Sequence, residues 1–425
     1  MKEDFLHFVW KYGYFSIHNL QTTDGQEIVI KSKGIHNHSN GPDFSNASLL
    51  IDGIEWLGHV EIHINSSDWL LHKHQYDKNY DSVILHVVWK EDKTITNSSG
   101  IKIPCLCLED RVDPSLLQKH QSLILQKSWI ACENQLTNID TSKVSLWLQA
   151  LAMDKLEIRA REILTLAKKL NYHWEQLFII YLFRAFGLRQ NKEAFDALVE
   201  KLPIEILNKY QHSTLKLEAL LFGVAGFLHS AKQKSIYLDD LHKEYQFLKH
   251  KHQFQEIPMT YWKFGRIRPA NFPTIRIAQL CNYLHQYPRA FQFLLEEDQQ
   301  TIINQLQTIS TSEFWDTHYQ FGQSSTFRKK IIGKSTIQLI LINAIVPVLF
   351  SYGKYKNDDH ITNKAVDIFE SIPSESNSII KKWKTAGVNS KHALQSQALL
   401  YLKKEYCDQY RCTSCQIGHQ ILSKK

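Results

Sequence analysis

The hydrophobic pattern of this chain changes period once, near residue 112, and this change constrains the fold more than any other feature of the sequence. Before it, short runs are either alternately apolar and polar or apolar throughout, as strands are. After it, apolar residues recur at helical spacing in many successive segments. We therefore expect an α+β protein in which a mixed β-sheet module of residues 1–112 packs on a larger, mostly helical region of residues 113–425.

The individual elements follow from local patterns. A short helix is expected over residues 3–12, and Asp52-Gly53 is typical of a β-hairpin turn. Strands are expected at 26–31, 45–51, 58–64, 83–89 and 101–108. Helices are expected at 114–128, 143–170, 174–188, 192–202, 214–230, 239–250, 274–285, 287–296, 299–308, 335–352, 361–370, 377–385 and 391–407. The apolar stretch from Ile337 to Phe350 is too short and too polar to span a membrane comfortably, so it is interpreted as a buried helix.

The segment from Gly41 to His63 carries the main chemical pattern. Because side chains alternate along a strand, Glu61 and His63 should share one face, and the hairpin would bring Asp43 close to Glu61. Two carboxylates beside a histidine can hold Mg²⁺ or Mn²⁺ and activate a water molecule. Asp43, Glu61 and His63 are therefore the candidate catalytic residues. The alternative is an ordinary solvated strand face that carries charge.

Other histidines surround this segment. His72 and His74 form an H-x-H pair that could clamp a metal ion from a loop, and His86 lies in an apolar strand from which it would reach Glu61 if the two strands were neighbours. A surface or hydrogen-bonded core role is the alternative for each of these three histidines. An oxygen-rich site suits Mg²⁺ or Mn²⁺, whereas a His-rich site suits Zn²⁺ or Mn²⁺. Candidates for outer supporting groups are His36, His38 and His59.

A second metal-binding pattern lies near the C-terminus. Cys407, Cys412, Cys415 and His419 are spaced C-x4-C-x2-C-x3-H, and the C-x2-C pair lets two thiolates meet one metal ion through a tight turn. Cys132 is an alternative fourth ligand. Zinc is the simplest ion for such a set, but thiolates alone do not distinguish zinc from an iron–sulfur cluster. We expect this site to fix the C-terminus rather than to perform chemistry, and the alternative is a set of reduced structural thiols.

Charge is distributed unevenly along the chain. Residues 1–110 hold nine lysines, no arginine and fifteen acidic residues, so this part has a net charge of −6 and the remainder has +13. A basic remainder favours an anionic partner such as nucleic acid, although a solvated basic surface is an equal alternative. Within it, Lys263, Arg266, Arg268 and Arg276 cluster near a predicted helix N-terminus, where they could bind phosphate or instead brace the fold.

These motifs carry two resemblances. The runs GPDF, GHVEIH, SDW and VILHVV, with RIRPANFPTIRIAQL at residues 266–280 and the terminal cysteine run that ends in Cys415, resemble a bacterial family catalogued as domain of unknown function 2851. The resemblance extends over the whole chain, and the family brings no established activity. The Pro-Asp that ends at Asp43 and the run Glu61-Ile62-His63 resemble the PD-(D/E)xK nuclease superfamily. There a Pro-Asp opens one strand, and an acid, a spacer and a lysine close the next. His63 stands where that superfamily has its lysine. The lysine supplies a positive charge near the attacking water, whereas a histidine is mostly neutral near pH 7.

The leading hypothesis is therefore a metal-dependent, nuclease-like phosphodiesterase that acts on nucleic acid. One alternative is a catalytically inactive nucleic-acid-binding or scaffold protein on a nuclease-like fold, and another is a His/carboxylate metallohydrolase of a small substrate. Glu3 and Asp4 precede any apolar run, which is not typical of a signal peptide, and the chain has seven cysteines. These features favour a cytoplasmic protein in a reducing compartment, without membrane attachment.

Overall fold

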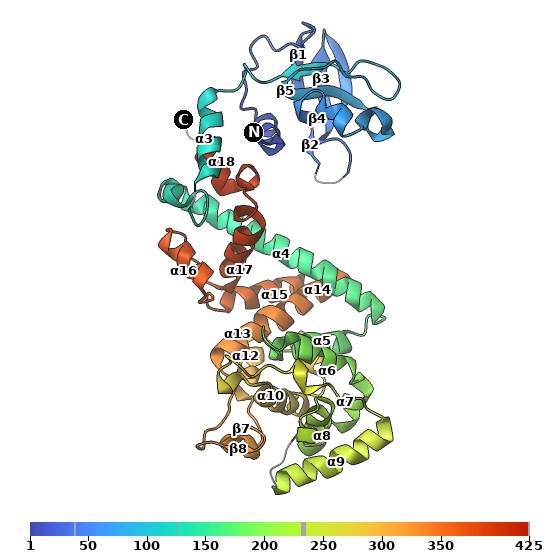
Figure 1. Cartoon of the computed structure of the whole chain (residues 1–425), viewed down its shortest axis with the longest axis vertical. Coiled ribbons are helices and arrows are strands. Elements are labelled where there is room, and N and C mark those ends of the chain that lie inside the picture. The colour runs from blue at the N-terminus through green and yellow to red at the C-terminus, as the bar shows by residue number, and fades with distance from the viewer. Residues whose placement is uncertain (38–39, 127, 231–234, 424–425) are drawn as a thin grey trace. The chain divides into compact units, whose positions relative to one another are not determined.

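The computed structural model describes residues 1–37, 40–126, 128–230 and 235–423 (Figure 1). The chain forms two compact units. The first consists of residues 1–148, 377–389 and 399–425, and the second of residues 149–376 and 390–398. A sheet near the N-terminus is followed by a largely helical remainder, which confirms the expected α+β class. The boundary expected at residue 112 stays a prediction.

The sheet of the first unit is mixed. Its strands are β1 (Ile28–Ser32), β2 (Ile35–His36), β3 (Phe44–Ile51), β4 (Ile54–Asn65), β5 (Val83–Lys90) and β6 (Cys105–Cys107). The order across the sheet is β1-β3-β4-β5-β6, and β2 also pairs with β3. The pairs on the β3 side are antiparallel, whereas β4–β5 and β5–β6 are parallel. The five predicted strands are present, and the two-residue β2 was not predicted.

The turn between β3 and β4 has the backbone of a two-residue hairpin. Asp52 and Gly53 have φ values of 48° and 79°, and Ile51 pairs with Ile54 across the turn. Positive φ at both central positions is what a type I′ turn requires, and the twist of this turn matches that of the strands. The predicted hairpin is therefore confirmed, and it sets the register of β3 against β4.

β5 and α1 (Glu3–Tyr12) supply much of the apolar surface around the sheet. Every residue from Val83 to Val88 is buried, as expected of a strand that lies between two parallel neighbours, here β4 and β6. The predicted helix at 3–12 is confirmed, and it packs against β4. Its buried side chains are Phe5, Leu6, Phe8, Val9 and Trp10. The amphipathic pattern of α1 thus places one edge of the helix against the strand that carries Glu61 and His63.

Helices make up most of the remaining chain. Those assigned wholly or partly to the first unit are α3 (Pro114–Leu125), η3 (Glu133–Asn138), α4 (Thr141–Lys169), α16 (Ser378–Thr385), α17 (Ala393–Leu402), η9 (Lys403–Cys407), η10 (Cys412–Ser414) and α18 (Gln416–Leu422). α4 and α17 also contribute residues to the second unit. Most of the boundaries agree with the predicted segments to within a few residues.

The second unit contains further helices and one small hairpin. Its α-helices include α5 (Trp174–Phe186), α6 (Lys192–Glu200), α7 (Ile204–Tyr210), α8 (Thr214–Val224), α9 (Ile236–His252), α10 (Pro273–Gln286), α11 (Ala290–Glu296), α12 (Gln299–Thr308) and α15 (Asp359–Ser371). The hairpin consists of β7 (His318–Gln320) and β8 (Gln323–Ser324). Neither α7 nor this hairpin was predicted, because both are too short to establish a period.

One long helical stretch of the second unit runs from α13 (Lys334–Ile340) through the π-helical η8 (Leu341–Ile345) into α14 (Val346–Lys356). Pro347 lacks the N–H that would bind the Asn343 carbonyl, and Arg159 donates to that oxygen instead at 2.9 Å. Among the described residues, this helix is the one long and apolar enough to cross a membrane, but 78% of its apolar window is buried inside the protein. The expectation of a buried helix is therefore confirmed.

A buried histidine on α3 makes the stability of the first unit sensitive to acid. His120 is 4% exposed and packs against Phe5, and burial, followed by the charge of the N-terminus, lowers its pKa to about 4. Between an ordinary histidine pKa of about 6.5 and about 4, the unfolded state binds more protons at this histidine than the folded state does. His120 therefore lowers the free energy of unfolding by at most about 1.4 kcal/mol for each unit by which the pH is decreased. We expect His120→Phe to reduce this slope in urea unfolding at about pH 7 and about pH 4.5. An unchanged slope would contradict this explanation.

Candidate metal centre

Asp43 and Glu61 come together where β3 begins beside β4. The Asp43 N–H donates to Glu61 Oε2 at 3.0 Å, and the Ile62 N–H donates to Asp43 Oδ2 at 2.9 Å. Glu61 is 5% exposed, and burial raises the pKa of its carboxyl group. The structure therefore brings the two predicted carboxylates together, and each accepts a hydrogen bond from the backbone of the neighbouring strand.

His7 on α1 is a third group at this position, and it was not predicted. Its Nε2 lies 3.2 Å from Asp43 Oδ2. Burial lowers the pKa of His7, but the neighbouring carboxylates of Asp43, Glu3 and Asp4 together outweigh burial, so the pKa is raised above its ordinary value. His7 thus favours a positive charge next to Asp43. One histidine on an amphipathic helix gives no signal in the sequence, and its role becomes visible only when α1 is packed on the sheet.

His63 is the centre of a chain of imidazole rings. Its Nδ1 lies 2.8 Å from His86 Nε2, and its Nε2 lies 3.0 Å from His72 Nδ1. β4 and β5 are neighbours, and Glu61 stands opposite His86, which is the condition under which His86 was expected to reach the site. Burial, followed by neighbouring histidines, lowers the pKa of His63 to about 2 and that of His86 to about 3. Both rings are neutral near pH 7, so His63 does not supply the charge of the lysine whose position it takes.

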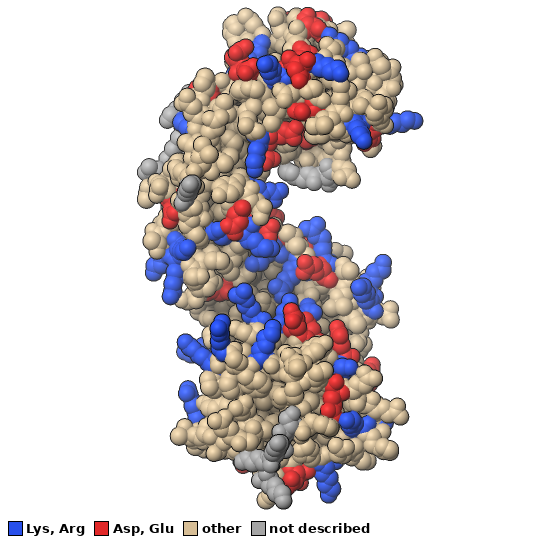
Figure 2. All heavy atoms as spheres, viewed as in Figure 1, with Lys and Arg blue, Asp and Glu red and all other residues tan. Residues whose placement is uncertain are grey.

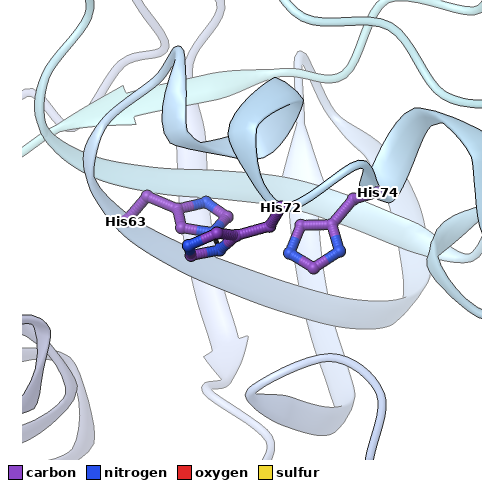
Figure 3. Close-up of side chains that lie close together, drawn as sticks. All are labelled: His63, His72 and His74. Atoms are coloured by element: carbon purple, nitrogen blue, oxygen red, sulfur yellow. Dashed lines mark hydrogen bonds between the residues drawn. The ribbon is translucent and has the colours of Figure 1, made fainter.

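His72 and His74 reach the same place from the loop after β4. The chain runs through α2 (Asp68–Leu71) into η1 (His74–Tyr76), and Lys73 between them has φ of 63°. This left-handed residue turns the backbone, and the rings on both sides of it lie beside His63 (Figure 3). The ligand nitrogens of the three histidines all lie within 4.8 Å of one another. The H-x-H pair therefore meets the strand histidine from a loop.

Aromatic rings hold His74 in this position. Tyr80, at the end of η2 (Lys78–Tyr80), stacks on it with ring centroids 3.8 Å apart, and Trp69 meets its ring edge-on at 5.3 Å. Trp69 is fully buried and packs in a small apolar core beside β5. Burial, followed by the Glu61 charge, raises the pKa of Tyr80 to about 12, so its hydroxyl stays protonated near pH 7. The loop that carries His74 is thus anchored by apolar packing.

Three imidazoles lie close enough together for a single metal ion, and the Glu61 carboxylate lies beside two of them, His63 and His74. Ligands about 2.0–2.1 Å from one tetrahedral ion lie about 3.4 Å apart. His63 Nε2 is 3.0 Å from His72 Nδ1, His74 Nε2 is 3.4 Å from Glu61 Oε1, and His63 Nε2 is 3.7 Å from the same oxygen. His74 Nε2 is buried and lacks a well-directed hydrogen bond among the described residues, as a metal ligand does without its ion. This set favours Zn²⁺ or Mn²⁺ over Mg²⁺.

The site is accessible from one side, because His72 is exposed whereas His63 is buried. The other histidines near it have separate contacts. His36 stacks on Phe44, and His59 Nδ1 accepts from the Asn46 N–H at 3.3 Å. His38 lies outside the described residues. His36 and His59 therefore adjoin the strands that carry the cluster.

The four predicted cysteines line one small cavity in the first unit, together with Ala131, Tyr406, Arg411 and Gly418. Burial raises the pKa of Cys132 to about 12 and that of Cys412 to about 11. His419 is not part of this cavity lining, because its Nε2 lies 2.9 Å from the Tyr14 hydroxyl and its ring stacks on Tyr12. The structure therefore groups Cys132, rather than His419, with the three C-terminal cysteines.

The four predicted basic residues are not all at the surface. Arg276 is 3% exposed and donates to Gln279 at 2.7 Å and to Thr336 at 2.7 Å, and burial lowers its pKa to about 10. Its guanidinium group therefore braces α10 from inside the second unit. The other three are exposed, and their binding of an anion stays a prediction: Lys263, Arg266 and Arg268.

The fold and the cluster define a class of protein: an α+β chain whose mixed sheet carries a His-rich candidate metal centre. The family described as "Protein of unknown function (DUF2851)" matches residues 3–378, and the chain belongs to this family. No curated protein and no solved structure matches. The predicted family is therefore confirmed, and the likeness to PD-(D/E)xK nucleases stays a prediction.

Proposed function

We propose that this protein is a divalent-metal-dependent phosphodiesterase that cleaves nucleic acid. The observation that supports it most is the convergence of His63, His72 and His74 at a spacing that suits one metal ion, with Glu61 Oε1 beside His63 and His74. A metal ion bound there would lower the pKa of a water molecule and stabilise negative charge on a phosphoryl group. The exposed side of His72 would give water and substrate access to this position.

The protein side chains divide the remaining work. Glu61 Oε1 faces the histidines, while Glu61 Oε2 accepts the Asp43 N–H, so the carboxylate is fixed in one orientation. His86 would orient His63 through the 2.8 Å contact to its Nδ1, so that His63 Nε2, beside His72 Nδ1, would face the metal ion. His7, held beside Asp43, would supply the positive charge that a lysine gives in PD-(D/E)xK nucleases.

Nucleic acid is the proposed substrate because of the charge of the chain. Residues 111–425 carry a net charge of +13, which favours an anionic partner. On the face drawn in Figure 2, the described basic side chains are interspersed with acidic ones. The exposed Lys263, Arg266 and Arg268 are candidate backbone contacts in the second unit.

The proposal is tested with the full-length protein after its metal has been removed by a chelator. Mn²⁺, Zn²⁺ or Mg²⁺ is then added back, and cleavage of end-labelled single-stranded DNA, double-stranded DNA and RNA is measured. We expect Mn²⁺ or Zn²⁺ to restore more cleavage than Mg²⁺, because imidazole ligands favour the former ions. Salt-sensitive binding without cleavage under any metal would instead support the inactive nucleic-acid-binding alternative.

A metallohydrolase of a small substrate is the second candidate. The three candidate histidine ligands favour it, because enzymes with His-rich metal centres also hydrolyse esters and amides that are not nucleic acids. The same metal-loaded preparation distinguishes the two when it is offered small phosphodiesters, carboxylic esters and amides beside the nucleic acids. Turnover of a small ester or amide, without affinity for nucleic acid, would replace the phosphodiesterase proposal.

A further inference from the structure

Four cysteines from two distant parts of the sequence meet in the first unit. Cys132 precedes η3, Cys407 ends η9, Cys412 begins η10 and Cys415 precedes α18. All four thiols are free, and they line the same small cavity. Three of the four lie beyond residue 378, where the family match ends. This cavity is separate from the histidine cluster and plays no part in the proposed hydrolysis.

The local backbone is built to keep these sulfur atoms together. A Cβ on Gly418 would lie 2.0 Å from the Cys412 carbonyl oxygen, so only glycine lets α18 pack this closely on η10. The N–H groups of Ile417 and Gly418 at the start of α18 are directed at Cys415. The indole nitrogen of Trp147 is buried without a conventional acceptor, and it also faces Cys415. Donors aimed at a sulfur atom stabilise a thiolate that binds metal.

Positive charge is also present at this cavity. Arg411 is part of its lining, and Lys403, which pairs with Asp408, lies near Cys407. Four thiolates on one metal group carry a large negative charge, which cationic side chains offset.

The spacing of the sulfur atoms separates two kinds of metal group. Thiolates about 2.3 Å from one tetrahedral zinc ion lie about 3.8 Å apart. Among the described residues, however, no three cysteine sulfurs lie within 4.8 Å of one another, whereas His63, His72 and His74 meet that limit. Thiolates that bind different metal atoms of a cluster are spaced more widely than those on a single ion. We propose that Cys132, Cys407, Cys412 and Cys415 hold an iron–sulfur cluster, which ties the C-terminal segment to the segment at η3.

The proposal is tested on the full-length protein purified without oxygen, by measuring iron, acid-labile sulfide and zinc per chain. We expect iron and sulfide in equal amounts, with visible charge-transfer absorption. Cys132→Ser should lower the sulfide content at least about fivefold, because one of four ligands is lost. Cys107→Ser is the matched control, since Cys107 lies on β6 and donates to the Trp89 carbonyl outside this cavity. This control should keep the sulfide content.

Three results would overturn the cluster. One is zinc without sulfide in the unmodified chain, and another is a chain without either metal. The third is unchanged sulfide in the Cys132→Ser protein. The measurement on the unmodified chain decides the question even if a cysteine variant fails to fold. Only the cysteine site would contain sulfide, so the sulfide content also distinguishes this site from the histidine cluster. The double change His72→Ala and His74→Ala should therefore leave the sulfide content unchanged.

Discussion

Replacement of Glu61 by glutamine is expected to lower metal-dependent phosphodiester cleavage about a thousandfold, which corresponds to about 4 kcal/mol in the activation barrier. The change keeps the size of the side chain and its contact with the Asp43 N–H, but removes the charge that faces His63 and His74. It therefore removes an anionic ligand from the metal centre without opening a cavity. The measurement is the rate of cleavage at saturating Mn²⁺ with the substrate that the unmodified protein cleaves.

Glu55→Gln is the matched control for this experiment. Glu55 lies on the same strand, β4, but its side chain is 50% exposed and pairs with Lys31 at 3.1 Å. An exposed ion pair of this kind contributes little to stability, because solvent screens it, so we expect cleavage to stay near that of the unmodified protein. Equal losses from Glu55→Gln and Glu61→Gln would show that the effect comes from the strand rather than from the metal centre. Full activity of Glu61→Gln would remove Glu61 from the mechanism.

The combined change His72→Ala and His74→Ala is expected to weaken Mn²⁺ or Zn²⁺ binding by more than about a hundredfold. Loss of an outer partner of a metal ligand already costs about 10–100-fold in affinity, and here two direct ligands are lost. Both residues lie in the loop segment after β4, away from the sheet hydrogen bonds, so the sheet should keep its fold. Isothermal titration of the metal into chelator-treated protein measures the change.

His18→Ala serves as the control for a general loss of histidine. His18 is exposed and lies in the same unit, outside the cluster, so metal affinity should not change. Thermal unfolding of each variant in the metal-free state checks that the fold is intact. Equal affinity in the double variant and the unmodified protein would exclude His72 and His74 as ligands.

The parts of the site that were predictable depend on local rules. Asp52-Gly53 determines the turn, and alternation along β4 puts Glu61 and His63 on one face. The hairpin brings Asp43 towards Glu61, with one register shift between Phe44 and Ala47 that the sequence did not predict. The H-x-H pair is also local, because a single left-handed residue, Lys73, turns the two rings toward one another. Most helices of the second unit were predictable for the same reason, because apolar residues recur with a period of 3.6 residues within each segment.

The parts that could not be predicted depend on long-range packing. The pairing of β4 with β5 places His86 beside Glu61, but the sequence gives no register for strands joined by a long connection. His7 reaches Asp43 only because α1 packs against β4. His419 had the right spacing for a metal ligand, yet α18 directs it to Tyr14. Spacing restricts which residues can meet, whereas packing decides which of them do.

The most direct test of the metal centre is an anomalous-difference map from crystals of the full-length protein grown with Mn²⁺. We expect one peak about 2.0–2.2 Å from nitrogen atoms of His63, His72 and His74 and from an oxygen of Glu61. A map with Mn²⁺ bound elsewhere, or without a peak among these four side chains, would contradict the assignment of this cluster as a metal site.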